Sequence, residues 1–126
     1  MNINAPVADW ATKITPNVAA ELQKDPQVNY VIPIYDSMSQ FVVPAITQAG
    51  RTGKVHIATY NGTRFVMGYL SKGTAVRFEV GENLDWIGYG NMDQNMRILA
   101  GLKPVKTEHL ALRAFTKDNI NQAGTP

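Results

Sequence analysis

The sequence contains no cysteine, which excludes disulfide bonds, thiol catalysis and zinc sites built on cysteine. It also lacks any run of about 18 apolar residues, the length that a membrane helix needs, so we expect no membrane insertion. Its 12 Lys and Arg residues are scattered rather than interleaved with aromatic residues, so we expect no binding to nucleic acid. Residues 1–10 have neither the basic nor the apolar region of a signal peptide, which predicts a cytoplasmic protein if the chain is complete.

Signatures of catalysis and of cofactor binding are also missing. The sequence has no Walker loop, no GxSxG nucleophile elbow and no HExxH zinc pattern. The glycines of residues 88–93 do not directly follow a strand pattern and lack the third glycine of a dinucleotide-binding loop. His56 alternates with apolar neighbours, which is typical of a packed strand residue, and His109 lies in a polar loop. We therefore expect no enzymatic activity, no cofactor and no metal site.

The composition is that of an ordinary globular protein. The chain has 126 residues, of which 44% are hydrophobic and 17% charged, with a formal net charge of +2. This length allows one domain with its own core. Short apolar segments alternate with helical patterns through short connections. This order predicts an α/β fold over residues 1–126: a mainly parallel, doubly wound sheet with helices on both faces, in three layers.

Three segments are typical of buried parallel strands because they are almost continuously apolar: 30–35, 54–60 and 75–80. Pro33 suggests a local break in the first of them, because proline donates no ladder hydrogen bond. A last strand is expected over 110–115. Helices are expected after residues Thr15, Asp36, Thr63 and Leu84, with a separate short turn over 10–14.

The longest helical pattern runs from Leu84 to Ala100. Its apolar residues recur at helical spacing, which predicts that they face the core. They are Leu84, Ile87, Met92, Met96 and Leu99. At the other end of the chain, residues 2–7 form a weakly extended segment that Pro6 limits as a strand.

Polar residues stand where three strands end: Asp36, Asn61 and Glu82. Ligands of open parallel sheets bind outside the carboxyl ends of the strands, so we expect these residues to converge on one site. Each also has a purely structural interpretation. Asp36 suits a helix N-cap, Asn61 a turn with positive φ, and Glu82 a helix start. No base or nucleophile stands beside them, so they favour hydrogen bonding to a polar ligand such as a sugar.

Aromatic residues near these strand ends are candidates for the apolar face against a sugar ring. They are Tyr35, Tyr60, Phe65 and Trp86. Trp86 has an equally good interpretation as a residue of the core.

The segments DPQVNYVIPIYDSMSQFVVPAITQAG, KVHIATYNGT and AVRFEVGENLDWIGYGNMDQNMRILAG resemble the C-terminal lobe of type I periplasmic sugar-binding proteins. These are ribose-binding-protein-like components of ABC importers, and the resemblance covers about residues 7–120. It implies ligand contacts at Asn61, where relatives often have Asp before Gly-Thr, and at Glu82, where ribose binders commonly have Gln. The family's Asn-Asp pair falls on Tyr35 and Asp36. Tyr in the place of Asn leaves open which of the two touches ligand.

The resemblance implies a truncated or half-sized solute-binding protein of a sugar ABC transporter, outside the cytoplasm and with a permease as partner. Such proteins close two lobes on their ligand, and this chain has one lobe at most. It lacks the first strand and helix of that lobe, because residues 2–7 would match the second strand. A gap in mid-sheet exposes apolar surface and unpaired backbone groups, so we expect a second copy to fill it in a homodimer.

Two other functions remain open on the sequence. The first is an effector-binding or sensory domain of a lactose-repressor-like regulator, which shares this fold but needs a helix-turn-helix that is not found here. The second is a small flavodoxin-like enzyme or nucleotide binder, for which the phosphate-cradling glycines are missing. The chemical identity of the ligand does not follow from the residues.

Overall fold

The computed structural model describes residues 2–122. They form one four-stranded sheet in the order β1 (Tyr30–Val31), β2 (His56–Asn61), β3 (Val76–Gly81) and β4 (Arg113–Phe115). The first three strands run parallel, and β4 is antiparallel to β3. The predicted α/β class and mainly parallel sheet are confirmed.

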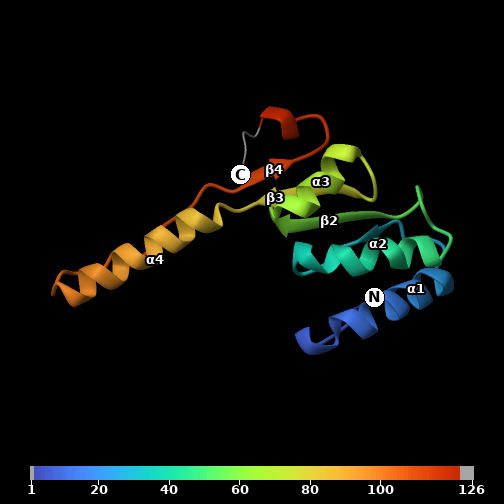
Figure 1. The fold of residues 1–126 in the computed structure, drawn as a ribbon, viewed down its shortest axis with the longest axis horizontal. Coiled ribbons are helices and arrows are strands. Elements are labelled where there is room, and N and C mark those ends of the chain that lie inside the picture. The colour runs from blue at the N-terminus through green and yellow to red at the C-terminus, as the bar shows by residue number, and fades with distance from the viewer. Residues whose placement is uncertain (1, 123–126) are drawn as a thin grey trace.

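Helices follow or precede each parallel strand. They are α1 (Trp10–Lys24), α2 (Ser39–Gln48), α3 (Arg64–Lys72) and α4 (Leu84–Leu99), with short 3-10 helices η1 (Val7–Asp9), η2 (Asp36–Met38) and η3 (Ile120–Gln122). Helices α1 and α2 lie side by side, and α4 projects away from the rest of the molecule (Figure 1).

The core lies between one face of the sheet and helices α1, α2 and α3. Val55 and Ile57 of the β2 region are fully buried, and each of the three helices contributes apolar residues from one side. Leu22, Ile46 and Leu70 are among the most deeply buried of these. The core therefore belongs to residues 10–81 and to the end of β4.

The opposite face of the sheet is open. Successive strand residues point to opposite faces. On the side away from the core, apolar side chains are exposed in β1, in the residues that follow it and in β3, and those of β2 are half-buried. Ile32 and Ile34 are 74% and 61% exposed, and Tyr30 and Phe78 are exposed as well. Among residues 2–122, one helical layer of the three-layer arrangement is therefore present and the second is lacking at this face.

Three details of the N-terminal half differ from the prediction. Residues 2–6 form no strand, and η1 follows them. Helix α1 runs without a break through Pro16, and the hydroxyl of Thr15 donates to the Phe41 carbonyl (3.0 Å) and does not cap a new helix. Strand β1 ends at Val31, since the proline two residues later has no N–H for the ladder, as its position suggested.

Helix α4 has the predicted extent, but the prediction of its packing is wrong. None of its residues is buried. Leu84, Met92, Met96 and Leu99 are exposed, and Ile87 is only half-buried. Apolar residues also lie on other sides of the helix, since Trp86 and Ile98 are exposed as well. The apolar spacing did not indicate that the chain leaves the sheet before α4 begins. The last strand is also shorter than the predicted 110–115.

Arg51 joins the end of α1 to the start of β1. Its guanidinium donates to the carbonyl oxygens of Leu22, Pro26 and Val28, each at 2.8 Å, and more weakly to that of Asp25 at 3.4 Å. The last carbonyls of a helix have no partner within the helix. Arg51 therefore satisfies groups that would otherwise lack a partner, and it fixes the connection that leads into the sheet.

We predict that Arg51→Met lowers the free energy of unfolding by about 2 kcal/mol. Hydrogen bonds to a charged group contribute about 1.5–3 kcal/mol, and part-buried carbonyls lose their donor in the variant. Urea unfolding followed by circular dichroism measures the change. Lys54→Met is the matched control, because Lys54 is an exposed base three residues further on. Equal stability of both variants would contradict the role given to Arg51.

Candidate functional site

The carboxyl ends of the three parallel strands meet at one edge of the sheet. Asn61 is the last residue of β2, and its Nδ2 donates to Oε2 of Glu82 at 3.5 Å. The backbone N–H of Glu82 donates to the Asn61 carbonyl at 3.1 Å. Asp36 begins η2 after β1, and its Oδ2 accepts from the N–H and the hydroxyl of Thr63 at 2.7 and 2.6 Å. The three predicted residues are therefore brought together.

Asp36 lies below this edge and is not presented on it. It is 1% exposed, and its carboxylate holds Thr63. It makes no N-cap hydrogen bond for η2, so its interpretation as a cap is wrong. Of the pair Tyr35 and Asp36, Tyr35 is the residue accessible to a ligand, with 46% of it exposed.

Glu82 is not needed to start α4. The N-cap of that helix is Asn83, whose Oδ1 accepts from the N–H of Trp86 at 3.0 Å. Glu82 is half-buried and directed to Asn61. Capping of α4 therefore does not explain why a glutamate stands at this strand end.

Asn61 carries two unusual features. Its φ is 125°, which makes it the one non-glycine residue with positive φ in the described part of the chain. Its Oδ1 is buried and has no hydrogen-bond partner among residues 2–122. Strained backbones and buried polar atoms without partners are concentrated at functional sites. The next residue, Gly62, has φ 84°, and a Cβ there would lie 2.9 Å from Cα of Gly81. The turn therefore passes very close to β3.

Glu79 supports the turn from below, and the sequence analysis missed it. This β3 residue is fully buried, and its Oε1 accepts from the N–H of Gly62 at 2.7 Å. Burial, more than the nearby charge of Asp36, raises the pKa of Glu79 to about 7, and the hydrogen bond from Gly62 opposes this rise. A carboxyl group inside the apolar pattern of residues 75–80 was the signal for it, since buried carboxyl groups are rare unless partnered.

Two aromatic rings lie beside the polar edge. The ring of Tyr35 is 5.9 Å from that of Trp10, at an angle of 39°. The Trp10 indole N–H donates to the Ala5 carbonyl at 3.1 Å. Trp10 was also missed. Its place before a helical pattern gave no sign that α1 begins at the carboxyl edge of the sheet.

The other aromatic candidates lie elsewhere. Trp86 is exposed on α4, so it belongs neither to the core nor to the edge of the sheet that holds Tyr35. Phe65 packs edge to face against Tyr69, both on α3, and Tyr60 is half-buried in β2.

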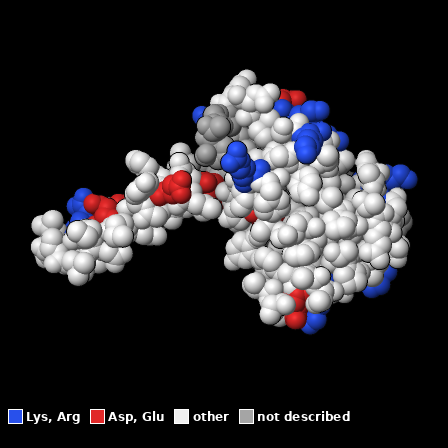
Figure 2. Space-filling model, in the orientation of Figure 1, with Lys and Arg blue, Asp and Glu red and all other residues white. Residues whose placement is uncertain are grey.

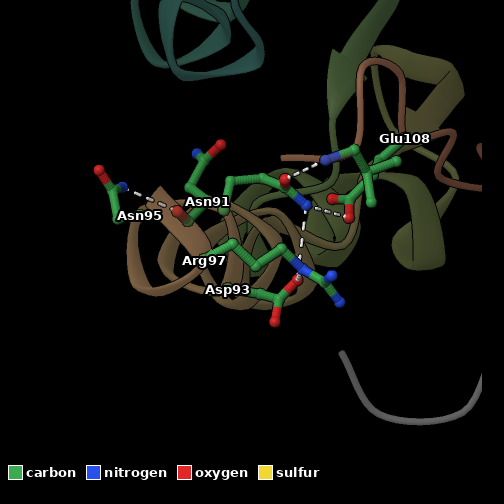
Figure 3. A network of polar contacts seen from close by, with 7 residues as sticks. Asn91, Asp93, Asn95, Arg97 and Glu108 are labelled. Carbon is green, nitrogen blue, oxygen red and sulfur yellow. Dashed lines mark hydrogen bonds and ion pairs between the residues drawn. The ribbon is translucent and has the colours of Figure 1, made fainter. Parts of the chain in front are cut away.

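A groove separates α4 from the segment that follows it. It is lined by Trp86, Tyr89, Asp93, Glu108 and His109 among others. Gln94 holds this segment to the helix, since it donates to Glu108 at 2.6 Å and accepts from the N–H of Val105 at 2.7 Å. Figure 3 shows these contacts beside the Asp93–Arg97 ion pair. Of the predicted candidates, Trp86 lines this groove, whereas Tyr35, Asp36, Asn61 and Glu82 do not.

No group of three potential metal ligands is found in residues 2–122. Within the same range, none of the helices has both the length and the apolar character to cross a lipid bilayer.

Comparison with known proteins gives matches at the level of structure. No protein-family model matches the sequence, and no curated protein sequence matches it either. A solved structure of an ABC transporter solute-binding protein from Agrobacterium vitis with bound allitol is 16% identical, with a TM-score of 0.81. The similarity covers 97% of this chain and 43% of that one.

Two further structures show the same fold. The 5-methylthioribose transporter solute-binding protein from Thermotoga lettingae, in complex with 5-methylthioribose, is 18% identical with a TM-score of 0.82, over 95% of this chain and 38% of that one. A Mycobacterium smegmatis protein in complex with β-D-fucofuranose is 24% identical, with a TM-score of 0.74, over 88% and 36%. The chain thus spans about two fifths of the length of these proteins, and its fold matches that part of them.

We predict that Asn61→Gly raises the free energy of unfolding by about 1 kcal/mol. Glycine adopts positive φ without strain, and the substitution removes the buried oxygen that has no partner. Asn61→Ala is the matched control. It removes the same amide but keeps a Cβ in the strained conformation, so we expect no gain in stability. Thermal unfolding of both variants is the measurement, and a destabilised Asn61→Gly would argue against strain at this residue.

Proposed function

We propose that this chain, which has the fold of a lobe of ABC transporter solute-binding proteins, binds a sugar or sugar alcohol without catalysis. The observation that carries the proposal is the Asn61 amide. It is held by a strained backbone at the edge where three strands end, and its buried acceptor lacks a partner among residues 2–122. A ligand hydroxyl is the kind of donor that this acceptor requires.

The chemistry of the edge suits a polyhydroxylated ligand. The Asn61 amide both donates and accepts, and the Glu82 carboxylate accepts from two hydroxyls. The rings of Tyr35 and Trp10 supply an apolar surface for the C–H face of a sugar. Two of the similar structures contain the ligands allitol and 5-methylthioribose. We propose ligands of this class for this chain.

The edge forms one wall of a site. The similar proteins are more than twice as long as the part that matches this chain. A single wall leaves much of a ligand in contact with water, so the 126-residue chain alone should bind weakly. We expect a dissociation constant of about 1 mM or higher, equivalent to about −4 kcal/mol.

The fold also suggests the wider setting. One of the similar structures is an ABC transporter periplasmic solute-binding protein from Actinobacillus succinogenes. We propose by this likeness that the protein acts outside the cytoplasm and that an ABC permease is its partner.

Titration calorimetry with pentoses, hexoses and their alditols tests the sugar proposal. We predict weak binding of at least one of them, and its loss in Asn61→Ala and in Glu82→Ala, because each removes a hydrogen-bonding group from the edge. Glu21→Gln is the control, since Glu21 lies on α1 and pairs with Lys24. The proposal is overturned if no compound of the panel binds at concentrations up to 50 times the expected dissociation constant. It is also overturned if binding survives both substitutions.

We also propose that two copies of the chain associate, and that α4 of each packs on the open sheet face of the other. Both surfaces are apolar and lack a partner among residues 2–122. On α4 the stripe consists of Tyr89, Met92, Met96 and Leu99, which are 58 to 82% exposed. On the sheet it consists of Tyr30, Ile32, Ile34 and Phe78.

The two surfaces are similar in length, and the stripe on α4 itself carries no charge. A helix of 16 residues is about 24 Å long, and a strand of six residues spans about 20 Å. The Asp93–Arg97 pair and Glu108 lie on the side of α4 held by the following segment (Figure 3). Figure 2 shows Lys and Arg side chains at several places on the body, and charged groups of both signs on the arm that α4 forms.

A reciprocal arrangement would cover four apolar side chains of each helix, eight in all, and the burial of apolar surface is the main favourable contribution to most protein association. Since the same contact is made twice around a two-fold axis, the assembly closes as a dimer.

We predict that analytical ultracentrifugation at micromolar concentration gives a dimer. The double variant Met92→Lys, Met96→Lys should be monomeric, because two ammonium groups cannot be buried against an apolar sheet. Asn91→Lys adds charge to the same helix outside the stripe and should remain dimeric. A monomeric wild-type chain at this concentration, or a double variant that stays dimeric, contradicts the arrangement.

A further inference from the structure

Two buried carboxyl groups lie beneath the turn that presents Asn61. Asp36 and Glu79 are 1% and 0% exposed. Together they accept three hydrogen bonds from two consecutive residues: the N–H of Gly62 to Glu79 at 2.7 Å, and the N–H and hydroxyl of Thr63 to Asp36 at 2.7 and 2.6 Å. The backbone immediately after Asn61 is therefore fixed by these two side chains.

One carboxyl oxygen of the pair has no hydrogen-bond donor in the described part of the chain. Oε2 of Glu79 is buried and meets no hydrogen-bond donor among residues 2–122. Two carboxylates this close repel each other, and in a buried site one of them retains a proton. A proton on Glu79 removes the repulsion and turns an acceptor without a partner into a donor for Asp36.

The surroundings of Glu79 leave Asp36 as its titratable neighbour. In the sheet, Glu79 lies opposite Thr59 of β2 and Phe115 of β4, neither of which titrates. The turn contributes the Gly62 N–H, and η2 contributes Asp36. Burial is the largest cause of the raised pKa of Glu79, which lies at about 7, and the charge of Asp36 adds to it.

We infer that Glu79 keeps a proton and donates it in a hydrogen bond to Asp36, and that this bond holds the Gly62–Thr63 turn so that the Asn61 amide is positioned for its ligand. Glu79 is thus a positioning residue, and the inference that it affects sugar binding rests on the function proposed above. When the proton is lost, two buried negative charges face each other, and the turn moves to let water reach them. The edge of the sheet is then no longer preorganised.

The direction of the pH effect follows from the raised pKa. The folded chain holds the proton up to about pH 7, whereas the unfolded chain loses it near the ordinary pKa of 4.5. The stabilisation is fully present below pH 4.5 and is lost as the pH rises through 7. Between these values the folding constant contributed by this group falls by up to tenfold per pH unit.

The test follows the amide N–H signals of Gly62 and Thr63 and the side-chain carboxyl carbon of Glu79 by NMR between pH 5 and 9. In the wild-type chain we expect all three to change with one common midpoint near pH 7. In Glu79→Gln the amide transitions should be absent, because glutamine keeps the acceptor for Gly62 and offers Asp36 a permanent donor. In Glu82→Gln, which removes the other nearby carboxyl group, they should remain.

Each outcome decides the inference. A Glu79 carboxyl that titrates near its ordinary pKa, or amide transitions that persist in Glu79→Gln, overturns the inferred hydrogen bond from Glu79 to Asp36. These readings need no ligand, so they stand even if the sugar proposal fails. With a sugar that binds, wild-type affinity should fall several-fold from pH 6 to 8 while that of Glu79→Gln stays constant. A pH-independent wild-type affinity overturns the positioning role.

Discussion

The structure depends on the attachment of one turn to the ends of two other strands. Gly62 and Thr63 follow β2 directly, and they donate to Glu79 of β3 and to Asp36 after β1. These hydrogen bonds lie below the surface, where water does not compete for them, so each is stronger than a similar bond in solvent. The backbone hydrogen bonds of the sheet connect β1 to β2 and β2 to β3. The hydrogen bonds of the turn join the ends of all three strands at one place.

This attachment explains why the edge of the sheet is both rigid and strained. Gly62 passes so close to β3 that a side chain at this residue would meet Gly81, and Asn61 has positive φ as a consequence of the same path. Strain of this kind persists only where surrounding bonds over-determine the conformation. The two carboxyl groups supply that constraint, and the Asn61 amide, whose Oδ1 is buried, is held at the edge by its contact with Glu82.

The sequence predicted the α/β class, the mainly parallel sheet and the convergence of Asp36, Asn61 and Glu82, because these follow from general rules. Alternating apolar segments and helices give parallel strands, and parallel strands end on one edge. The sequence could not distinguish a polar residue that faces solvent from one that holds the scaffold. Asp36 and Asn61 look equivalent in the chain, and only their depth below the turn separates them. Glu79 was missed for the same reason, since its partner is a backbone group distant in sequence.

Helix α4 shows a second limit of pattern reasoning. The spacing of Met92, Met96 and Leu99 predicted a side of the helix that packs on the core, but these residues are exposed, because spacing does not identify the surface that would cover them. The chain leaves the sheet at Asn83, and the side chain of Asn83 caps the first turn of α4. The direction of the whole helix is therefore set at this one residue. The open sheet face shows the same limit. Tyr30, Ile32 and Ile34 have the apolar pattern of a buried strand in a doubly wound fold, and the sequence did not show that no helix of the described residues covers them. Both surfaces are apolar and exposed among residues 2–122. The reciprocal dimer proposed above would cover both of them, and the wall of hydrogen-bonding groups proposed for the ligand would likewise need a second wall to enclose a sugar.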